Sequence, residues 1–545
     1  MLKQSPAIFH FSRSLLFLSA LFALISFSVP SLNGAEKKEK SEKKEKGKKE
    51  KKEKSTSSKD QKKEDKDDKG AAEKEEKSSE KGDSSKKRRL IVVKNGITEI
   101  EAKQFKGYSN LRKIVLPKGI TSIGDEAFSG CKMLEDIEIP ATVETIGKNT
   151  FEGCSRLTAL KLPNGLTEIS DETFKGCTSL ARIILPANLE KIGKGSFNGC
   201  TNLKGIRIPD KLTEIGEESF MGCSSLDSIK LPNELTSIGG KAFSGCRSLA
   251  AINIPAGVTE WGNNPFANCP RLTITLAPKH PSFLQFKGVI CSADKTTILH
   301  YSANKRQAAF IPPKQITTIG AGAFSGCLYL RAAALPPTLE TVQDEAFSNC
   351  ANLTTIQFRN PEVALGKGVF SNCTALRNIA LPEKCTELPE KLFSGCTKLT
   401  QIKFPAELEK IGDGVFEKCA GLRQLSFPKS VGSIGKKAFS GCIYLDKITF
   451  PENLSELGEN AFEKCIRLQD IRLPEGVSAV KKNTFSGCIS LRRVILPKSV
   501  ESVEEGAFDK CEKLTKVTTL NPDLEENEDV FGKKIKLVKP RKKKR

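Results

Sequence analysis

Cysteine recurs every 23 residues along most of the chain, and this spacing constrains the fold more than any other feature. The series runs without an error from Cys131 to Cys269 and resumes from Cys327 to Cys511. A phenylalanine stands three residues before each of these cysteines, and one further unit, marked by Phe105 and Tyr108, precedes them. Seventeen marked units in phase predict one repeat architecture rather than several unrelated domains.

Each unit carries apolar residues at fixed positions. In the unit that begins at Cys200 they are Leu203, Ile206, Ile208, Leu212, Ile215 and Phe220. The alternation of Ile206 and Ile208 around Arg207 indicates a half-buried strand. Pro209 ends this strand because proline has no N–H to donate. The segment around Phe220 has room only for a turn of helix or 3₁₀.

One such unit cannot bury its apolar surface alone, whereas stacked copies can, because each Leu, Ile, Phe and Cys then meets its own equivalent in the next coil. The pattern therefore predicts a repeat solenoid with a 23-residue period. We expect a parallel β-sheet with short turns on one face and second short strands, or 3₁₀ or helical turns, on the other. At ~4.8 Å per strand, the coils would form a body on the order of 80 Å long.

The frame Leu203-x-x-Ile206-x-Ile208 resembles the L-x-x-L-x-L frame of a leucine-rich repeat. The segments L-T-E-I-G-E-E-S-F-M-G-C at 212–223 and S-I-G-G-K-A-F-S-G-C at 237–246 resemble the BspA-type leucine-rich-repeat family, found on bacterial and some protist cell surfaces. The resemblance covers about residues 90–519. It implies extracellular binding, often adhesion to host or neighbouring cells, and it carries no catalytic residue and no single ligand.

The repeat pattern is interrupted between Cys269 and Cys327, which are 58 residues apart. Within the interruption, two runs rich in β-branched residues, 289–291 and 297–301, flank an Asp294–Lys295 turn and predict a β-hairpin. An insertion at 278–310 would divide the repeats into a first block, 90–277, and a second block, 311–520. It is interpreted either as a structural joint or as an island that grips a ligand.

The two ends of the chain differ from the repeats. Residues 1–35, with Lys3 and Arg13 before an apolar run of about 15 residues that Pro30 ends, predict a secretory signal peptide. An uncleaved anchor is the alternative, although a membrane span needs ~20 apolar residues. Residues 36–89 hold no aromatic residue and no aliphatic residue larger than alanine, which predicts a disordered linker. Residues 521–545 are interpreted as a basic tail.

From these ends we expect an exported protein, secreted or held at the cell surface, and lying in the periplasm or at the outer surface if the source is a Gram-negative bacterium. No later stretch is apolar enough to span a bilayer, so we expect no transmembrane segment in the mature chain.

Eighteen cysteines in an exported protein would normally suggest disulfides. Here sixteen occupy one inward position, so neighbours should lie near the strand spacing of ~4.8 Å, wider than the ~3.8 Å that a disulfide prefers between Cβ atoms. We therefore expect a buried column of free thiols. One cysteine per coil does not converge on a metal, and the chain has only three histidines. We expect no metal site and no cofactor.

Cys291, His280, His300 and Asp294 share the insertion, so a cysteine–histidine pair has to be considered. A catalytic cysteine needs a histidine within hydrogen-bond reach and an oxyanion hole. No cysteine-protease signature surrounds Cys291, and we interpret the cluster as chance. We expect a non-enzymatic protein, with an enzyme built on the insertion as the weakest alternative.

The residue between the two inward residues of each strand should point outward. This column reads Val115, Glu138, Lys161, Ile184, Arg207, Lys230 and Asn253, then Gln357, Ala380, Lys403, Ser426, Thr449, Arg472 and Ile495. Its basic members, Lys161, Arg207, Lys230, Lys403 and Arg472, form the candidate ligand-binding face. They favour anionic glycans or acidic protein surfaces. The alternative is that they only keep the protein soluble.

Two functions remain open after these steps. The first is an exported leucine-rich-repeat binding protein that recognises an extracellular protein or glycan ligand in adhesion or ligand recognition. The second is a structural envelope or matrix component, held to an anionic polymer by its basic flanks. The formal net charge is +22, and 36–89 and 521–545 contribute much of it. The column lacks interleaved aromatic residues, which argues against nucleic acid as the partner.

Overall fold

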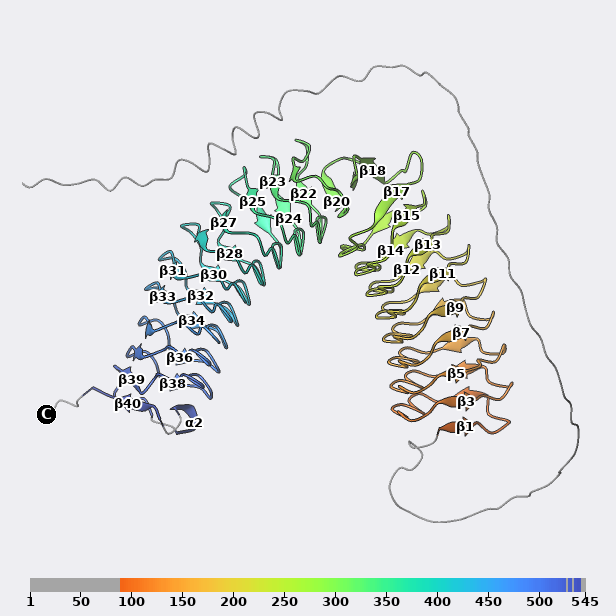
Figure 1. Cartoon of the computed structure of the whole chain (residues 1–545), viewed down its shortest axis with the longest axis horizontal. Coiled ribbons are helices and arrows are strands. Elements are labelled where there is room, and N and C mark those ends of the chain that lie inside the picture. Colours follow the sequence, from red (N-terminus) through yellow and green to blue (C-terminus); the bar gives the residue numbers. More distant parts are fainter. Residues whose placement is uncertain (1–88, 526–527, 532–533, 541–545) are drawn as a thin grey trace, which may run out of the picture. The chain divides into compact units, whose positions relative to one another are not determined.

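Two parallel strands per coil build the body of the protein (Figure 1). The computed structural model describes residues 89–525, 528–531 and 534–540, which belong to one compact unit, Lys81–Arg545. The expected signal peptide, the expected linker up to residue 88 and the basic residues 541–545 lie outside the described residues. The unit is a parallel β-solenoid with a period of about 23 residues, as the cysteine spacing predicts.

We call first sheet the row of longer strands, one per coil, most of which follow a cysteine of the series; its hydrogen bonding is interrupted, so that it divides into sheets of two to four strands. In the first block these strands are β1 (Leu90–Val92), β3 (Lys113–Val115), β5 (Asp136–Ile137), β7 (Ala159–Lys161), β9 (Arg182–Ile184), β11 (Gly205–Arg207), β13 (Ser228–Lys230), β15 (Ala251–Ile254) and β17 (Thr273–Leu276). After the insertion they are β21 (Ala309–Phe310), β23 (Ala332–Ala334), β25 (Thr355–Gln357), β27 (Asn378–Ala380), β29 (Gln401–Lys403), β31 (Gln424–Ser426), β33 (Lys447–Thr449), β35 (Asp470–Arg472), β37 (Arg493–Leu496), β39 (Lys516–Thr519) and β40 (Lys536–Val538).

The second sheet collects two-residue strands. They are β2 (Glu99–Ile100), β4 (Ser122–Ile123), β6 (Thr145–Ile146), β8 (Glu168–Ile169), β10 (Lys191–Ile192), β12 (Glu214–Ile215), β14 (Ser237–Ile238) and β16 (Glu260–Trp261). The second block continues with β22 (Thr318–Ile319), β24 (Thr341–Val342), β26 (Ala364–Leu365), β28 (Glu387–Leu388), β30 (Lys410–Ile411), β32 (Ser433–Ile434), β34 (Glu456–Leu457), β36 (Ala479–Val480) and β38 (Ser502–Val503).

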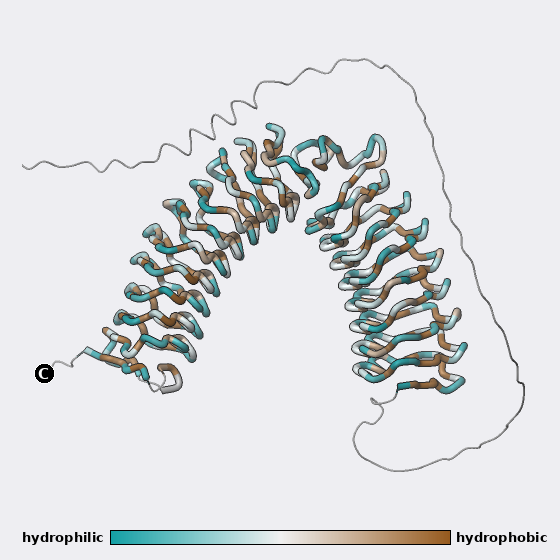
Figure 2. Tube along the Cα trace, in the orientation of Figure 1, coloured by the Kyte–Doolittle hydropathy of each residue, from teal (hydrophilic) through white to brown (hydrophobic). Residues whose placement is uncertain are grey.

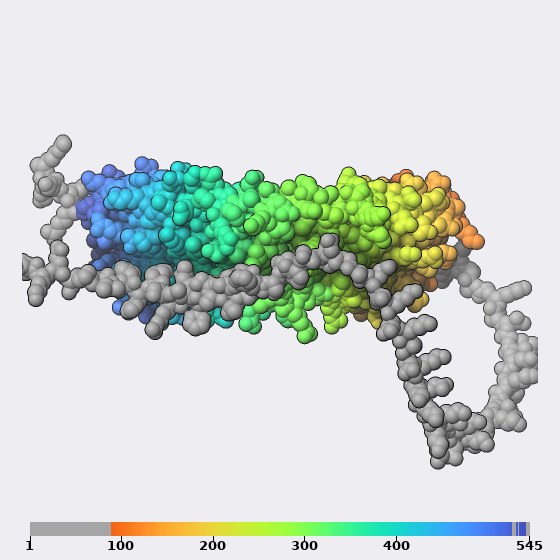
Figure 3. Space-filling view, turned by 90° about the horizontal axis from the view of Figure 1, so that it is seen from above, coloured from red at the N-terminus to blue at the C-terminus, as the bar shows by residue number. Residues whose placement is uncertain are grey.

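Equivalent residues of neighbouring coils face each other in register. Ile206 pairs with Ile229 in the first sheet, and Ile215 pairs with Ile238 in the second. Apolar segments recur at the same place in successive coils (Figure 2), and the coils follow one another in sequence order along the body (Figure 3). This register lets every inward side chain pack against its own equivalent, which is the packing that a repeat needs.

The phenylalanines form one file of stacked rings in each block, inside the turn that closes each coil. The rings of Phe220 and Phe243 are stacked, with centroids 5.3 Å apart and planes 3° apart, and both are fully buried. The backbone of this turn also bonds to the next coil, since the Phe220 N–H donates to the Ala242 carbonyl oxygen at 2.7 Å. The turn edge therefore stacks as regularly as the two sheets.

The cysteines line the core beside this file as free thiols. All eighteen are unpaired, and all except the partly buried Cys385 are buried. The Cys223 Sγ donates to the Phe197 carbonyl oxygen of the preceding coil at 3.2 Å, and this contact recurs along the column. Burial raises the pKa of the Cys200 and Cys223 thiols well above its usual value. The thiols therefore act as small, neutral core groups.

Glycine follows the short strands because the coils approach closely there. A Cβ built on Gly435 would lie 2.4 Å from Asp413 Oδ1 and 2.8 Å from the Asp413 backbone nitrogen. A Cβ on Gly458 would lie 2.4 Å from the Gly435 carbonyl carbon. Only a residue without a side chain fits this close approach.

The insertion contains the hairpin that its sequence predicts and one strand more. β19 (Val289–Ser292) pairs antiparallel with β20 (Thr297–Tyr301), and β18 (Phe283–Phe286) adds to the other side of β19. β20 then pairs parallel with β22, the first short strand of the second block. Tyr301 takes the place of the core phenylalanine, since its ring stacks on Phe324 at 4.9 Å.

The solenoid continues past residue 520, where the sequence interpretation placed the start of a basic tail. β40 pairs parallel with β39, and the short helix α2 (Glu528–Phe531) puts the Phe531 ring on Phe508 at 6.3 Å. Leu524 and Leu537 are buried as well. Residues 521–525, 528–531 and 534–538 thus belong to an irregular last coil. Phe531 keeps the 23-residue spacing from Phe508, but the coil has no cysteine, so the cysteine series does not mark it.

Replacing a ring in the phenylalanine file should destabilise the solenoid strongly. Phe220→Ala removes a fully buried ring from between two stacked neighbours, so we expect a loss of about 3–5 kcal/mol in the free energy of unfolding. Phe286→Ala is the matched control, because that side chain is 61% exposed. Urea unfolding followed by circular dichroism measures both. Equal small losses would contradict the stacked file.

The buried thiols should resist alkylation until the chain unfolds. With native protein we expect the thiol reagent to modify Cys385 first and the buried column hardly at all, because the reagent attacks the exposed thiolate. In urea, all eighteen cysteines should react. Mass spectrometry without reducing agent counts the modified groups, and Cys385→Ala shows whether the native signal belongs to that residue. A disulfide-linked peptide in the digest would contradict the free-thiol column.

Candidate ligand-binding face

The outward column predicted from the sequence lies on the exposed side of the first sheet. Its members are exposed, except for the half-buried Ile495. In β11 the pattern is clear, because Arg207 is exposed while Ile206 and Ile208 on either side of it are buried. The inward residues repeat from coil to coil, whereas the outward residues differ.

The five candidate residues lie in two separate groups. Arg207 of β11 pairs with Lys230 of β13, so these two cations are direct neighbours. Lys161 of β7 lies two coils before Arg207, with Ile184 of β9 between them. The other two candidates, Lys403 of β29 and Arg472 of β35, lie in the second block, separated by the coils that carry β31 and β33. The structure therefore does not bring all five together.

Basic side chains extend beyond this column into the turn that precedes each strand. We use the name strand face for the outward residues one, two, four, five and seven positions after each cysteine. From Cys327 to Cys511 its basic members are Arg331, Arg377, Lys398, Lys403, Arg423, Lys447, Arg467, Arg472, Arg492, Arg493, Lys513 and Lys516, and its acidic members are Asp446, Asp470 and Glu512. Basic groups thus outnumber acidic ones by twelve to three on this part of the face.

Sequence reasoning missed the most organised group on this face because it considered only the outward strand column. Tyr444 lies in the turn before β33, and its side chain is 43% exposed. The guanidinium carbons of Arg423 and Arg467, from the coil before and the coil after, lie 5.8 and 5.3 Å from the centre of its ring. The sequence did contain a signal for this group, because arginine is frequent two and four residues after the cysteine.

The opposite side of the solenoid pairs its charges. Lysines there contact carboxylates 23 residues away in the neighbouring coil. Examples are Lys148–Asp171 at 3.0 Å, Lys191–Glu214 at 3.1 Å, Lys194–Glu217 at 2.6 Å, Lys410–Glu387 at 2.8 Å, Lys436–Glu459 at 3.4 Å and Lys482–Glu505 at 2.9 Å. These surface pairs contribute little stability individually, but they neutralise the cations of this side.

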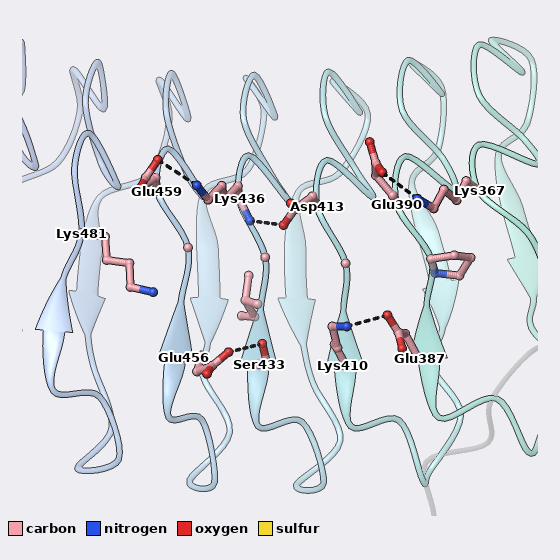
Figure 4. Close-up of a pocket in the computed structure, with 15 residues that line it drawn as sticks. Lys367, Glu387, Glu390, Lys410, Asp413, Ser433, Lys436, Glu456, Glu459 and Lys481 are labelled. Atoms are coloured by element: carbon pink, nitrogen blue, oxygen red, sulfur yellow. Dashed lines mark hydrogen bonds and ion pairs between the residues drawn. The ribbon is translucent and has the colours of Figure 1, made fainter.

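A groove of about 410 Å³ runs over β28, β30, β32 and β34 on this paired side (Figure 4). Glu387, Lys410, Ser433 and Glu456 lie along one wall, and Glu390 and Lys436 lie along the other; Gly412, Gly435 and Gly458 also line it. Three of its lysines, Lys367, Lys410 and Lys436, contact carboxylates that line it, and its glycines are explained by the close approach of the coils. The groove is therefore a product of coil stacking, and we assign it no ligand.

The insertion does not bring Cys291 into a hydrogen bond with His280 or His300, so the cysteine–histidine pair considered from the sequence does not form. Cys291 is buried in the core of the second block, and burial raises the pKa of its thiol. His300 packs edge-on against Phe266 of the first block at 6.2 Å, and the His280 Nε2 lies 3.0 Å from the Pro255 carbonyl oxygen. Within the described residues, neither imidazole hydrogen-bonds to Cys291. No group of His, Cys, Asp or Glu in that part of the chain is placed to hold a metal.

The repeats themselves match a known family. The BspA type leucine rich repeat region matches in six copies, over residues 84–204, 144–273, 300–423 and 409–537. The chain belongs to the BspA-type leucine-rich-repeat family. This assignment agrees with the solenoid and with the resemblance of the quoted segments.

Solved structures of bacterial leucine-rich-repeat proteins are similar to this BspA-type chain. A leucine-rich cell surface protein from Faecalibacterium prausnitzii is 28% identical, with a TM-score of 0.49, over 66% of this chain and 87% of that one. A leucine-rich repeat protein from Bacteroides ovatus is 30% identical, with a TM-score of 0.41, over 73% and 88%. The Treponema pallidum leucine-rich repeat protein is 26% identical, with a TM-score of 0.30, over 33% and 86%. No curated protein matches the chain.

The family suggests a role in binding or recognition. Among the residues that the structure describes, no helix has the length and apolar character needed to cross a bilayer.

One buried histidine of the insertion, His300, should make the solenoid sensitive to acid. Burial lowers the pKa of His300 to about 4, below the ~6.5 of an unfolded chain. The unfolded chain therefore binds the proton first, and stability is lost as the pH falls from about 6.5 towards 4. This one group should cost about 3 kcal/mol at pH 4.

Urea unfolding at pH 7 and pH 4 tests this effect of His300. Carboxylates also destabilise the fold in acid, so the relevant quantity is the difference between the parent protein and His300→Leu. The variant should lose about 3 kcal/mol less between the two pH values. An identical pH dependence in both proteins would show that the imidazole is solvated or already charged.

Proposed function

We propose that this chain is an exported, non-enzymatic binding protein that recognises an extracellular protein or glycan ligand through its strand face, in adhesion or ligand recognition. One observation carries the proposal. Inward positions repeat because stacking demands it, whereas the outward residues of the first sheet are exposed and differ from coil to coil. A surface whose residues can vary without disturbing the regular stack of coils is suited to specific recognition.

The charge distribution favours the strand face over the opposite side. Lys161, Arg207 and Lys230 lie close together, and within the described residues they form no ion pair. The lysines of the opposite side contact carboxylates of their own chain instead. Uncompensated cations on one surface attract an anionic partner over a Debye length and accelerate its association.

Export belongs to the same proposal. The amino-terminal segment has the composition of a signal peptide, and BspA-type relatives include cell-surface proteins. We infer that residues 36–89 hold the solenoid away from the surface that carries it.

A second candidate function is a structural one, in which the basic flanks hold the protein to an anionic envelope polymer. The charge of the flanks supports it: residues 36–89 contain 23 basic and 16 acidic groups. In that case the solenoid would be a spacer or matrix element, and the strand face would have no ligand of its own.

Removing the five candidate cations from the strand face should weaken ligand binding without unfolding the protein. The variant replaces Lys161, Arg207, Lys230, Lys403 and Arg472 with glutamine. Tested against a panel of immobilised extracellular proteins and glycans, it should bind at least ten times more weakly than the parent, because these five exposed cations would no longer attract an anionic ligand.

The matched control replaces five lysines of the opposite side, Lys148, Lys191, Lys194, Lys410 and Lys436, with glutamine. It removes the same net charge and should keep its affinity. Parallel losses in both proteins would show that binding follows total charge rather than the strand face. Deleting 36–89 tests the second function: cell association lost with that segment, while the isolated solenoid binds nothing, would favour the envelope component.

A further inference from the structure

Two arginines on the strand face are held in place by one aromatic ring. Arg423 and Arg467 come from the coils on either side of Tyr444, and each guanidinium lies within cation–π distance of its ring. A guanidinium held over a ring by a cation–π contact still has N–H donors free to bind a ligand. The contact also removes part of the rotamer freedom that a binding arginine otherwise loses.

Neither guanidinium is neutralised by a neighbouring acid. Within the described residues, Arg423 and Arg467 form no ion pair and no side-chain hydrogen bond. The nearest acids do not pair with them: Asp470 contacts Arg493 at 3.7 Å. Asp446, whose N–H donates to the Arg423 carbonyl oxygen at 2.9 Å, has its Oδ1 buried with no hydrogen-bond partner in the part of the chain described. The unit therefore presents two guanidiniums that form no ion pair among the described residues.

Neutral hydrogen-bonding side chains surround this unit. They are Thr400, Gln401, Gln424, Ser426, Thr449 and Gln469, all exposed on the strand face of coils from Cys396 to Cys465. Hydroxyls and amides both donate and accept hydrogen bonds. A ligand that fits this face should carry many hydroxyl groups between widely spaced anionic groups.

From this arrangement we propose that Arg423, Tyr444 and Arg467 form an oxyanion-binding unit of the strand face, and that its ligand is an acidic polysaccharide. This inference rests on the proposed function and names its ligand class. The two guanidiniums bind sulfate or carboxylate oxygens through charge-assisted, bidentate hydrogen bonds. The neutral side chains bind the sugar hydroxyls, and successive coils, ~4.8 Å apart, match a chain of sugar rings.

Other anionic polymers fit this surface less well. Single-stranded nucleic acid binds by stacking bases on aromatic rings, and arginines from both neighbouring coils lie against Tyr444. An acidic peptide that adds to a sheet needs a free strand edge, whereas β31, β33 and β35 lie inside the stack of coils. An acidic polysaccharide needs neither a free ring nor an edge.

Binding of defined polymers to the full chain tests the proposal. The probes are heparin, as a sulfated polysaccharide, and polygalacturonate, as a carboxylated one, with polyglutamate and single-stranded DNA at equal charge as competitors. The parent should bind at least one polysaccharide more tightly than either competitor. Arg423→Gln with Arg467→Gln should weaken that binding tenfold or more.

Two further variants separate the stacked unit from charge alone. Arg331→Gln with Arg377→Gln removes the same charge from the same face, at two arginines that are also two coils apart and contact no aromatic ring, and it should weaken binding less than threefold. Tyr444→Leu keeps both charges but removes the ring, and it should weaken binding three- to tenfold. Circular dichroism and unchanged unfolding midpoints confirm that each variant folds.

Each outcome decides the proposal. Losses confined to the Tyr444 unit support it. Equal losses in both arginine pairs, tighter binding of polyglutamate or DNA, or no polysaccharide binding overturn it. The proposed function can survive a failure of this inference. It does so if the five-site strand-face variant binds some other ligand more weakly than the parent does. If the five-site variant binds every ligand like the parent, both fail.

Discussion

Stacking of each coil on an equivalent coil is the constraint from which the rest of this structure follows. The rings of Phe197, Phe220 and Phe243 lie one above another at 5.2 and 5.3 Å, and the thiols form a parallel column beside them. An inward residue must therefore suit two copies of itself, which restricts it to shapes that pack on themselves. Glycine is required for the same reason wherever two backbones approach, as at Gly435.

The same constraint divides the surface into two kinds. On the side of the short strands, equivalent positions in neighbouring coils alternate lysine with glutamate or aspartate, so Lys410 meets Glu387 and Lys436 meets Glu459. The strand face also has a few such pairs, Arg156–Glu135 at 3.0 Å and Arg493–Asp470 at 3.7 Å. In the second block, however, its basic residues outnumber its acidic ones, and like charges in neighbouring coils repel each other at a cost in stability. The anionic partner proposed above would relieve that repulsion.

The sequence predicts what is periodic and misses what is not. The 23-residue period predicts the solenoid, and alternation around Arg207 predicts which side chain of β11 points outward. Strand β18, with its exposed Phe286, lies outside the repeat, and the last coil, which includes Phe531 and β40, lacks the cysteine that marks the other coils, so both were missed. The Tyr444 unit was missed for another reason: its members lie in turns at two different repeat positions, and the lean of a long side chain towards a neighbouring coil follows from packing.

Periodicity also explains why recognition suits this chain better than catalysis. Catalysis needs unlike groups to converge on one point, but a solenoid places like residues in files, one coil apart. In the core, where equivalent positions hold like residues, unlike residues come together where the repeat is broken. The one large break here packs Cys291 into one core and His300 against the other, so they point away from each other. What the solenoid does supply is a long row of evenly spaced side chains, and the natural partner of such a row is a polymer whose own charged groups repeat.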